Sequence, residues 1–339
     1  MSADSVLKMY EDKQGILWIA TDSGISLLDS RAKPFQHYRT NSQLTNTLSH
    51  NNVRSLYAGR AGNVWVGTNG GGLNKFDRHT EEFIHYRHDP ADSNSLSHDS
   101  VRAIYEDRMG VVWVGTLGAG LNRFDPDTER FTHYRHDEAN PRSLSNNFIT
   151  CIYEDRTGTL WFGTWGGGLN AFDRESELFT RYQHDPEDPN TLGDNQVAIV
   201  VEDRAGVLWI GTLGGLTKFN REMKTFTRYQ HDPNDSGSLL ANSVMTIHED
   251  RAGALWIGLL GGLDKFDRKN EQFTHYTTAN GLPSDTIYGI LEDEQGRLWL
   301  STTKGLSRFD PRTESFRNYD VSDGLQSNTF LNFSAYSKS

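Results

Sequence analysis

The chain has 339 residues and a formal net charge of −11, from 34 lysines and arginines against 45 aspartates and glutamates. Its hydrophobic content of 35% is too low for a membrane-embedded chain, and its aromatic content of 11% is too high for a disordered one. The acidic balance disfavours a surface dedicated to nucleic acid or anionic membranes, and the single cysteine excludes an internal disulfide and a cysteine-based zinc site. We expect neither a signal peptide nor a membrane-spanning helix in this chain, because its start has no basic or apolar region and no stretch approaches ~18 consecutive apolar residues.

One short phrase recurs along the whole chain. Seven of the eight tryptophans follow Leu or Val and precede an apolar residue and then a small one, at successive spacings of 43 to 48 residues. Self-similarity at a nearly fixed period predicts a repeat architecture. The repeated tryptophans are Trp18, Trp65, Trp113, Trp161, Trp209, Trp256 and Trp299.

The third unit contains four short segments that are rich in β-branched and aromatic residues, as strands prefer. They are Val101–Tyr105, Val111–Thr116, Leu121–Phe124 and Phe131–Arg135. An Asp-x-x-Gly turn follows the first segment, and a glycine-rich turn follows the second. No unit shows a helical period, so the pattern predicts four antiparallel strands per unit and almost no α-helix.

Apolar residues recur on both faces of each unit, so each sheet must be covered on both sides. Stacking the units around a ring achieves this and leaves only short, protected edges. We therefore predict an all-β fold, a seven-bladed β-propeller with four antiparallel strands per blade; an open β-solenoid is the alternative. Residues 1–322 are assigned to the propeller, and residues 323–339 to the start of an eighth repeat that closes the ring or leads into a missing domain. The predicted blades span 5–39, 53–87, 101–135, 149–183, 197–230, 244–277 and 287–319.

The connection from each fourth strand to the next first strand is long, and it carries a leucine that we interpret as an apolar pin. A recurring histidine in the same loops could bind a metal, but equivalent positions on different blades lie around the ring and do not converge. We interpret the histidines as loop-packing and hydrogen-bonding residues, and we expect no metal and no cofactor. The leucines are Leu48, Leu96, Leu144, Leu192, Leu239, Leu282 and Leu325, and the histidines are His88, His136, His184 and His231.

Three further features have both a catalytic and a structural interpretation. Glu-Asp pairs such as Glu106-Asp107 recur in six of the seven units, so turn chemistry explains them better than a glycosidase, which needs one unique pair. Cys151 stands where other units have Ser, Ala or Ile, which indicates a small buried position rather than a nucleophile. His248 replaces a recurring tyrosine and is interpreted as a core residue.

The repeated phrase closely resembles the repeats of the two-component-regulator propeller family, and Val197–Asn220, VAIVVEDRAGVLWIGTLGGLTKFN, matches nearly throughout. The resemblance covers essentially the whole chain, and it is specific for the repeat rather than for a ligand. It implies the sensor region of a hybrid two-component or diguanylate cyclase receptor, located in the periplasm or outside the cell. No kinase signature, phosphate-binding loop or GGDEF-like stretch occurs in the sequence, so the resemblance implies a sensor or binding module.

Residues that differ between units are free to form a site, whereas repeated residues build the blades. After the tryptophan phrase, four neighbouring units place an apolar residue at one position. Such an arc indicates either a partner or ligand surface, or packing under the long loops. Its members are Leu117, Trp165, Leu213 and Leu260.

The second and third units each carry a histidine and an arginine near the predicted entrance of the ring. His50 and His98 come three residues before the first strand, and Arg54 and Arg102 are the second residues of that strand. Because an arginine fork suits a carboxylate or a sulfate, we predict an anion site with the histidines as hydrogen-bond partners. The alternative is that these two units are simply close copies.

Two further residues complete the predicted ligand site: Trp165 supplies an apolar ring face, and Tyr288 closes the opposite wall of the channel. The predicted function is a non-enzymatic, ligand-sensing propeller for oligosaccharides, which signals through blade packing or dimer geometry. A polysaccharide lyase with a His or Tyr base is one alternative, and a protein-interaction scaffold is another. The expected partners are a small-molecule or oligosaccharide ligand and a homodimer formed through a parent receptor, with no nucleic acid and no membrane contact.

Overall fold

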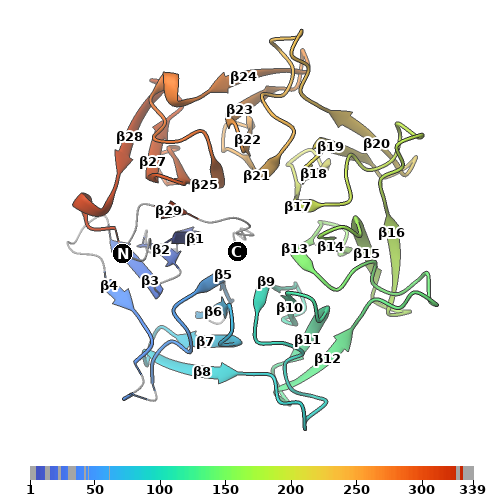
Figure 1. Cartoon of the computed structure of the whole chain (residues 1–339), viewed down its shortest axis with the longest axis vertical. Helices are drawn as coiled ribbons and strands as arrows, with labels where there is room; N and C mark the ends of the chain where they lie inside the picture. Colours follow the sequence, from blue (N-terminus) through green and yellow to red (C-terminus); the bar gives the residue numbers. More distant parts are fainter. Residues whose placement is uncertain are drawn as a thin grey trace.

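The prediction of a seven-bladed β-propeller is confirmed. Seven sheets stand around a common axis, and each contains four antiparallel strands that follow one another in the chain (Figure 1). We number the blades 1 to 7 in chain order. The computed structural model describes residues 5–11, 16–21, 24–29, 36–41, 43–44, 46–60, 62–325 and 329–330.

Within each blade the first strand lies nearest the axis and the fourth lies on the outside (Figure 1). The first strands are β1 (Ser5–Glu11), β5 (Val53–Ala58), β9 (Val101–Glu106), β13 (Ile149–Glu154), β17 (Val197–Glu202), β21 (Val244–Glu249) and β25 (Ile287–Glu292). The second strands are β2 (Ile16–Thr21), β6 (Asn63–Thr68), β10 (Val112–Thr116), β14 (Leu160–Thr164), β18 (Leu208–Thr212), β22 (Leu255–Leu259) and β26 (Leu298–Thr302). The third strands are β3 (Gly24–Asp29), β7 (Leu73–Asp77), β11 (Leu121–Asp125), β15 (Leu169–Asp173), β19 (Gly215–Asn220), β23 (Gly262–Asp267) and β27 (Gly305–Asp310). The fourth strands are β4 (Gln36–Tyr38), β8 (Glu82–Tyr86), β12 (Arg130–Tyr134), β16 (Leu178–Tyr182), β20 (Thr225–Tyr229), β24 (Gln272–Tyr276) and β28 (Ser315–Tyr319).

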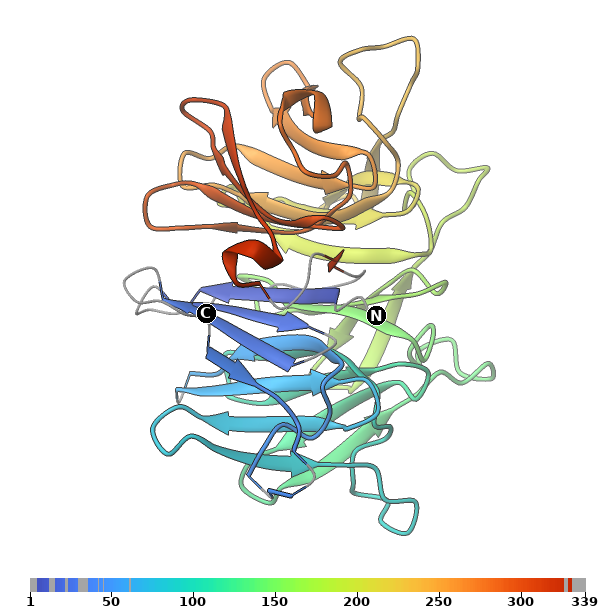
Figure 2. The ribbon, with the colours of Figure 1, turned by 60° about the vertical axis from the view of Figure 1, so that its left-hand side comes forward.

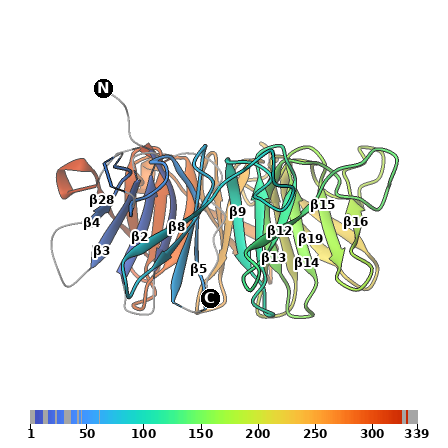
Figure 3. The ribbon, with the colours of Figure 1, turned by 90° about the horizontal axis from the view of Figure 1, so that it is seen from below.

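The strands run between two faces of the ring (Figure 3). The long connections between blades and the turns from second to third strands lie on one face, which we call the loop face. The turns from first to second and from third to fourth strands lie on the other, which we call the hairpin face. The long loops project well beyond the blades (Figure 2). Two short 3-10 helices, η1 (Thr278–Asn280) and η2 (Val321–Asp323), are the only helices in the described ranges.

The repeated tryptophan packs between neighbouring blades. Trp113 is 1% exposed, and its ring centre lies 5.3 Å from that of Phe172 on the next blade in an edge-to-face contact. Trp161 meets Phe219 in the same way. Edge-to-face aromatic pairs contribute about 0.5–1.5 kcal/mol each beyond their burial, so the tryptophans hold each blade against the following one.

The glycine of the tryptophan phrase marks the closest approach of two blades. A Cβ added at Gly115 would lie 2.6 Å from Ile149 Cγ2 on the next blade. Real Cβ atoms do not approach that closely, so any side chain here would push blades 3 and 4 apart. The repeated glycine is therefore required by packing between blades, not by a turn.

The sheet of blade 1 has a fifth strand. The strand β29 (Thr329–Phe330) pairs in parallel with β1. Leu325 is 5% exposed and packs in a cluster with Met9 and Leu291 at the junction of blades 7 and 1. Most of the predicted final segment, 323–339, lies outside the described residues, so the division at residue 322 stays a prediction.

Candidate functional site

The recurring loop histidines serve the long loops themselves. The backbone N–H of His88 donates to Asp99 Oδ1 at 2.8 Å, and His88 Nδ1 lies 2.8 Å from the carbonyl oxygen of Leu96. The three equivalent histidines make the same contacts, and the leucines under the loops are at most 5% exposed. Their interpretation as packing and hydrogen-bonding residues is confirmed. Within the described part of the chain, no three His, Cys, Asp or Glu side chains are arranged to hold a metal ion.

Two residues weighed as catalysts lie in the interior. Cys151 is 2% exposed, and burial raises the pKa of its thiol to about 12, so the thiolate form that a nucleophile needs is scarce at neutral pH. His248 is 8% exposed. Both positions agree with their interpretation as core residues.

On the hairpin face, the aspartate of each Glu-Asp pair fixes its own hairpin. Asp107 is fully buried, and its Oδ1 accepts the backbone N–H groups of Met109 at 2.9 Å and Val111 at 3.0 Å. Its Oδ2 accepts the indole N–H of Trp113 at 2.9 Å. The same aspartate–tryptophan bond occurs in blades 4 to 7, so turn chemistry accounts for the aspartates.

The glutamate of each pair has a different role, and the interpretation as turn chemistry alone was wrong. Glu154 Oε2 accepts the backbone N–H of Arg108 on the preceding blade at 2.7 Å, and Glu154 Oε1 lies 2.9 Å from Arg108 Nε. The Arg108 guanidinium also donates to the carbonyl oxygens of Asp155 and Arg156. Equivalent contacts join blades 4 to 5, 5 to 6 and 6 to 7. The glutamates therefore fasten neighbouring blades together.

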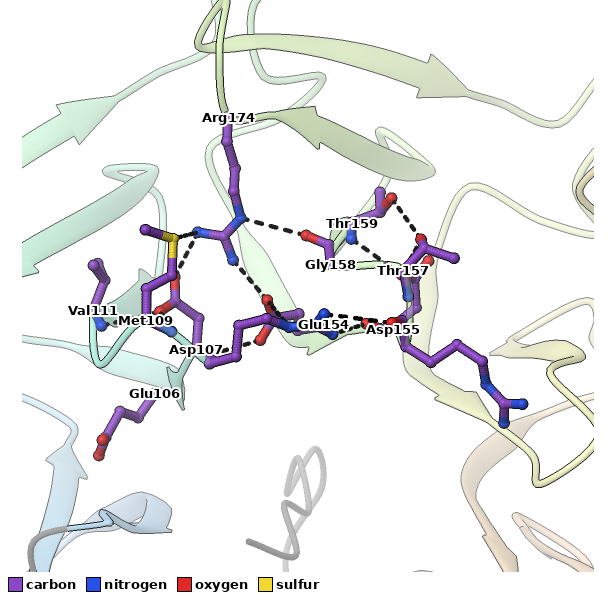
Figure 4. A network of polar contacts seen from close by, with 12 residues as sticks. Glu106, Asp107, Met109, Val111, Glu154, Asp155, Thr157, Gly158, Thr159 and Arg174 are labelled. Carbon is purple, nitrogen blue, oxygen red and sulfur yellow. Dashed lines mark hydrogen bonds and ion pairs between the residues drawn. The ribbon is translucent and has the colours of Figure 1, made fainter.

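A second arginine reaches back from the turn between the third and fourth strands. Arg174 of blade 4 donates from Nη1 to Asp107 Oδ2 on blade 3 at 2.7 Å, and from Nη2 to Glu154 Oε1 at 2.8 Å (Figure 4). The equivalent arginines of blades 5 and 6 repeat both ion pairs. Each buried aspartate of blades 3 to 5 thus has a guanidinium from the following blade.

Blades 2 and 3 depart from this pattern together. Blade 2 has Gly59 where the other units have the aspartate, and blade 3 has Pro126 where blades 4 to 6 have the reaching arginine. The two changes match, because an arginine at position 126 would find no carboxylate at position 59. Blade 7 also has a proline, Pro311, although Asp250 of blade 6 is present. The charges of the hairpin face are thus largely matched to one another, as expected of a network that holds the ring together.

A cavity of about 340 Å³ lies on the hairpin face at the ends of the first strands. Four glutamates line it, and each accepts a backbone N–H from an arginine of the preceding blade. Burial alone would raise the pKa of Glu292, but His248, whose Nε2 lies 3.6 Å from Glu292 Oε2, and the backbone N–H of Arg251 hold it below its usual value. These carboxylates are therefore already engaged in fastening blades. They are Glu154, Glu202, Glu249 and Glu292.

On the loop face, the second residue of the first strand is a β-bulge in each of blades 2 to 7. The strand register skips residues 54, 102, 150, 198, 245 and 288. A bulge redirects the side chain of the extra residue. Strand alternation in the sequence therefore could not give the direction of Arg54 and Arg102.

Arg54 and Arg102 line one small cavity on the loop face, between blades 2 and 3, with a volume of about 100 Å³. Arg102 is 8% exposed, and burial together with the nearby charge of Arg54 lowers its pKa to about 9. The Arg102 guanidinium therefore remains charged at neutral pH, and a bound anion would offset its repulsion from Arg54. The other lining residues are Asn69, Ser100, Val101 and Leu117.

His50 and His98 are exposed and do not line this cavity. Nδ1 of His50 accepts the backbone N–H of Asn52 at 3.1 Å, and Nδ1 of His98 accepts that of Ser100 at 2.9 Å. When Nδ1 of a neutral imidazole accepts a hydrogen bond, Nε2 carries the proton. Each ring is therefore set to donate a hydrogen bond from Nε2.

Sequence reasoning missed Phe148, which connects two of the predicted site residues. The Arg102 guanidinium lies 5.8 Å from the centre of the Phe148 ring, and the Trp165 ring meets the same ring edge-on at 6.2 Å. The other units have a polar residue at this position, just before the first strand. An aromatic residue at a unit-specific position was the signal that could have identified it.

Tyr288 is on blade 7, across the axis from blade 3 (Figure 1). It packs against the cluster that contains Met9 and Leu291 at the junction of blades 7 and 1, and burial raises its pKa. The structure thus brings together Arg54 and Arg102, and Phe148 extends this group to Trp165. The role of Tyr288 as an opposite wall stays a prediction.

Two of the four residues of the apolar arc are exposed on the surface. Leu117 is 42% exposed and Leu260 is 39% exposed, whereas Trp165 and Leu213 are half-buried. Leu117 also lines the cavity of Arg54 and Arg102. Apolar and cationic surfaces therefore adjoin on the loop face.

The repeats match a known family. The family described as the two component regulator propeller matches residues 1–23, 47–70, 95–118, 143–166, 191–214 and 281–304. Six of the seven units, all except that of blade 6, therefore match the two-component regulator propeller repeat. Each complete match to the family repeat begins at the end of a long loop and ends at the turn after the tryptophan phrase. No curated protein matches the chain significantly.

Solved structures resemble this regulator propeller in fold. An extracellular domain of a one-component system from B. thetaiotaomicron is 23% identical, with a TM-score of 0.62, over 93% of this chain and 48% of that domain. PorZ, a surface component of the type-IX secretion system of Porphyromonas gingivalis, is 16% identical with a TM-score of 0.69, over 89% of this chain and 46% of PorZ. Virginiamycin B lyase from Staphylococcus aureus is 16% identical with a TM-score of 0.64, over 88% of this chain and 91% of the lyase.

These likenesses concern the fold. The regulator propeller spans about half the length of the extracellular domain and of PorZ. In the ranges that the structure describes, no helix has the length and apolar character needed to cross a membrane.

Proposed function

We propose that this regulator propeller is the ligand-binding part of a sensor located outside the cytoplasm, and that it binds an acidic oligosaccharide without catalysing a reaction. The family match and the fold shared with extracellular domains of bacterial one-component and hybrid two-component systems support the sensor role. The cavity of Arg54 and Arg102 supports the acidic ligand. Ligand binding there would alter the packing of blades 2 and 3, which gives the sensor its signal.

The single observation that carries the proposal is the pairing of two guanidinium groups in one cavity beside an aromatic surface. A cavity of about 100 Å³ holds a carboxylate or sulfate group, not a whole sugar. The sugar ring would lie outside it, against Phe148 and Trp165, whose rings are in contact. The exposed Nε2 donors of His50 and His98 would serve hydroxyl groups.

The fold shared with virginiamycin B lyase raises a lyase as the second candidate. A lyase needs a base near the proton to be removed. In His50 and His98 the accepting Nδ1 leaves Nε2 protonated, so these rings are set to bind rather than to take up a proton. This observation favours the binding function over the lyase.

The test uses galacturonate oligosaccharides and the same oligosaccharides with their carboxyl groups reduced to alcohols. We expect the acidic oligosaccharides to raise the free energy of unfolding by about 2.7 kcal/mol at 100 times the Kd, and the neutral ones to have no effect. Absorbance of unsaturated products is followed in the same samples and should not increase.

Each outcome bears on a different part of the proposal. Formation of unsaturated product would replace the binding function with the lyase. Equal stabilisation by acidic and reduced oligosaccharides would move the site away from the arginines. No stabilisation by either set would overturn the oligosaccharide ligand.

A further inference from the structure

The outer edge of blade 7 carries a cluster of arginines on the hairpin face. A cavity of about 240 Å³ is lined there by four arginines and one carboxylate, that of Asp310. The lining side chains come from the turn into β26, from β27, and from the turn and strand that form β28. The arginines are Arg297, Arg308, Arg312 and Arg317.

Two of these four arginines have carboxylate partners. Arg297 Nε lies 2.7 Å from Asp293 Oδ2, and Arg312 Nη2 lies 3.2 Å from Asp310 Oδ2. In the described part of the chain, Arg308 and Arg317 form no ion pair; their guanidinium groups lie over aromatic rings of the same blade, Trp299 at 5.8 Å and Tyr319 at 5.0 Å. The cluster therefore has two positive charges that no carboxylate among the described residues neutralises.

The two unneutralised arginines face each other directly. Arg308 on β27 is the cross-strand partner of Arg317 on β28. Like charges directly opposite in an antiparallel pair are destabilising. The pair therefore weakens the outer edge of this blade unless something else neutralises it.

The other blades avoid this arrangement. At the same two positions, blades 2 to 6 place a cation or alanine opposite an uncharged side chain. Among blades 2 to 7, only blade 7 has an arginine in place of the threonine or isoleucine. These pairs are Lys75 with Ile84, Arg123 with Thr132, Ala171 with Thr180, Lys218 with Thr227 and Lys265 with Thr274.

We propose that the arginine cluster of blade 7 binds a tetrahedral dianion, in the chemical form of a phosphate monoester on a small molecule. A phosphate monoester carries ≈ −1.5 to −2 charges at neutral pH, which matches the two unneutralised guanidinium groups, and guanidinium forks suit its oxygens. The net charge of −11 disfavours a long polyanion such as nucleic acid. This site lies on the outer edge of blade 7 and is independent of the cavity between blades 2 and 3.

The experiment measures the affinity of the wild type for glucose 6-phosphate, glucose 6-sulfate and inorganic phosphate by calorimetry at constant ionic strength. We expect binding in the order of charge, with the phosphate ester tighter than the singly charged sulfate ester. Affinity for glucose 6-phosphate should fall as pH drops below its second pKa of about 6. Inorganic phosphate binding as tightly as the ester would identify the free ion as the source of the dianion.

The other blades supply the matched variants. Arg317→Thr introduces the residue of blades 3 to 6, and we expect at least about a tenfold loss of affinity, because the variant removes charge-assisted hydrogen bonds to the dianion. Arg308→Lys keeps the charge but loses the fork, and should weaken binding less. Lys265→Thr changes the equivalent cation of blade 6 and should leave the affinity unchanged.

Folding is checked by thermal unfolding without anion. Arg317→Thr should unfold at the same or a higher temperature than the wild type, since it removes a like-charge pair. No binding by the wild type, equal affinity of the wild type and Arg317→Thr, or an equal loss in Lys265→Thr would each overturn the proposal.

Discussion

The two faces of the ring use arginine in opposite ways. On the hairpin face, the arginines that recur in the turns of blades 3 to 6 contact a carboxylate or a backbone carbonyl on a neighbouring blade, as Arg108 and Arg174 do. On the loop face, Arg54 and Arg102 occur in two adjacent blades only and line a cavity together. A residue that repeats with its partner holds the ring together, whereas Arg54 and Arg102 are specific to two blades and are the residues to which we assign the proposed ligand.

The largest loss should come from removing a repeated carboxylate of the hairpin face. In Asp203→Ala, the guanidinium of Arg268 and the indole N–H of Trp209 lose their shared acceptor at a position that is 1% exposed. Breaking a buried charge pair costs about 3–5 kcal/mol, and the partial exposure of Arg268 places the expected loss near the lower end, at about 3 kcal/mol in urea unfolding. Glu187→Ala, at an exposed loop position, is the control and should change the free energy of unfolding by less than about 0.5 kcal/mol.

The same variant has an expected pH dependence. Burial alone would raise the pKa of Asp203, but hydrogen bonds from Arg268 and Trp209 hold it below its usual value. Its contribution is therefore present above the unfolded pKa of about 4 and is lost as pH falls through the lower folded value. A difference between wild type and Asp203→Ala that persists unchanged in acid would show that charge is not the cause.

A smaller loss is expected from removing one arginine that joins two blades. Arg156 pairs with Glu202 and donates to two carbonyl oxygens of blade 5, but half of its side chain is exposed. Solvent screening makes the contribution of this ion pair to the free energy of unfolding much smaller than that of a buried pair. Arg156→Ala should therefore lose about 1–2 kcal/mol in urea unfolding. Arg135→Ala, an exposed arginine of blade 3, should lose almost nothing; equal losses would show that the contacts between blades are not what Arg156 contributes.

The fold could be predicted from the sequence because the same pattern of four strand-like segments occurs in seven successive units. The tryptophan period located every blade, and the recurring loop leucines are buried as expected. The role of Glu154 could not be predicted, because its partner Arg108 lies on another blade and sequence spacing within one unit does not show it. The direction of Arg102 depended on a β-bulge, which changes side-chain direction without a signature in the alternation.

Blade 6 differs from blades 2 and 3 at one pair of facing residues on the third and fourth strands. Blade 6 has an aspartate opposite a histidine, where blades 2 and 3 have a neutral asparagine opposite a histidine. His275 Nδ1 lies 2.7 Å from the fully buried Asp264 Oδ1, and His275 Nε2 lies 3.0 Å from the carbonyl oxygen of Ser236. The hydrogen bond that His275 donates to Asp264 raises the pKa of His275, and burial raises the pKa of Asp264, although the same hydrogen bond partly offsets that rise.

Asp264→Asn should therefore remove a pH-dependent part of the stability with little loss at neutral pH. A raised histidine pKa gives stability that is present below about pH 6.5 and is lost as pH rises through the folded value, and the raised pKa of Asp264 acts in the same direction. The variant should unfold within about 1 kcal/mol of the wild type at pH 7 and show a flatter decline of stability above it. A decline as steep as that of the wild type would exclude the pair as its cause.

The central claim is that the unit-specific arginines of the loop face bind an anion and do not hold blades together. The most direct measurement compares the wild type with Arg54→Ala/Arg102→Ala, since alanine is the native residue of blade 5 at this position. Arg87→Ala/Arg135→Ala, two exposed arginines of the same blades, is the control. Calorimetry with digalacturonate should show at least about a 100-fold loss of affinity for the first variant and none for the control, and both variants should melt within about 2 °C of the wild type. Unchanged digalacturonate affinity in Arg54→Ala/Arg102→Ala, or a large fall in its melting temperature, would contradict the account.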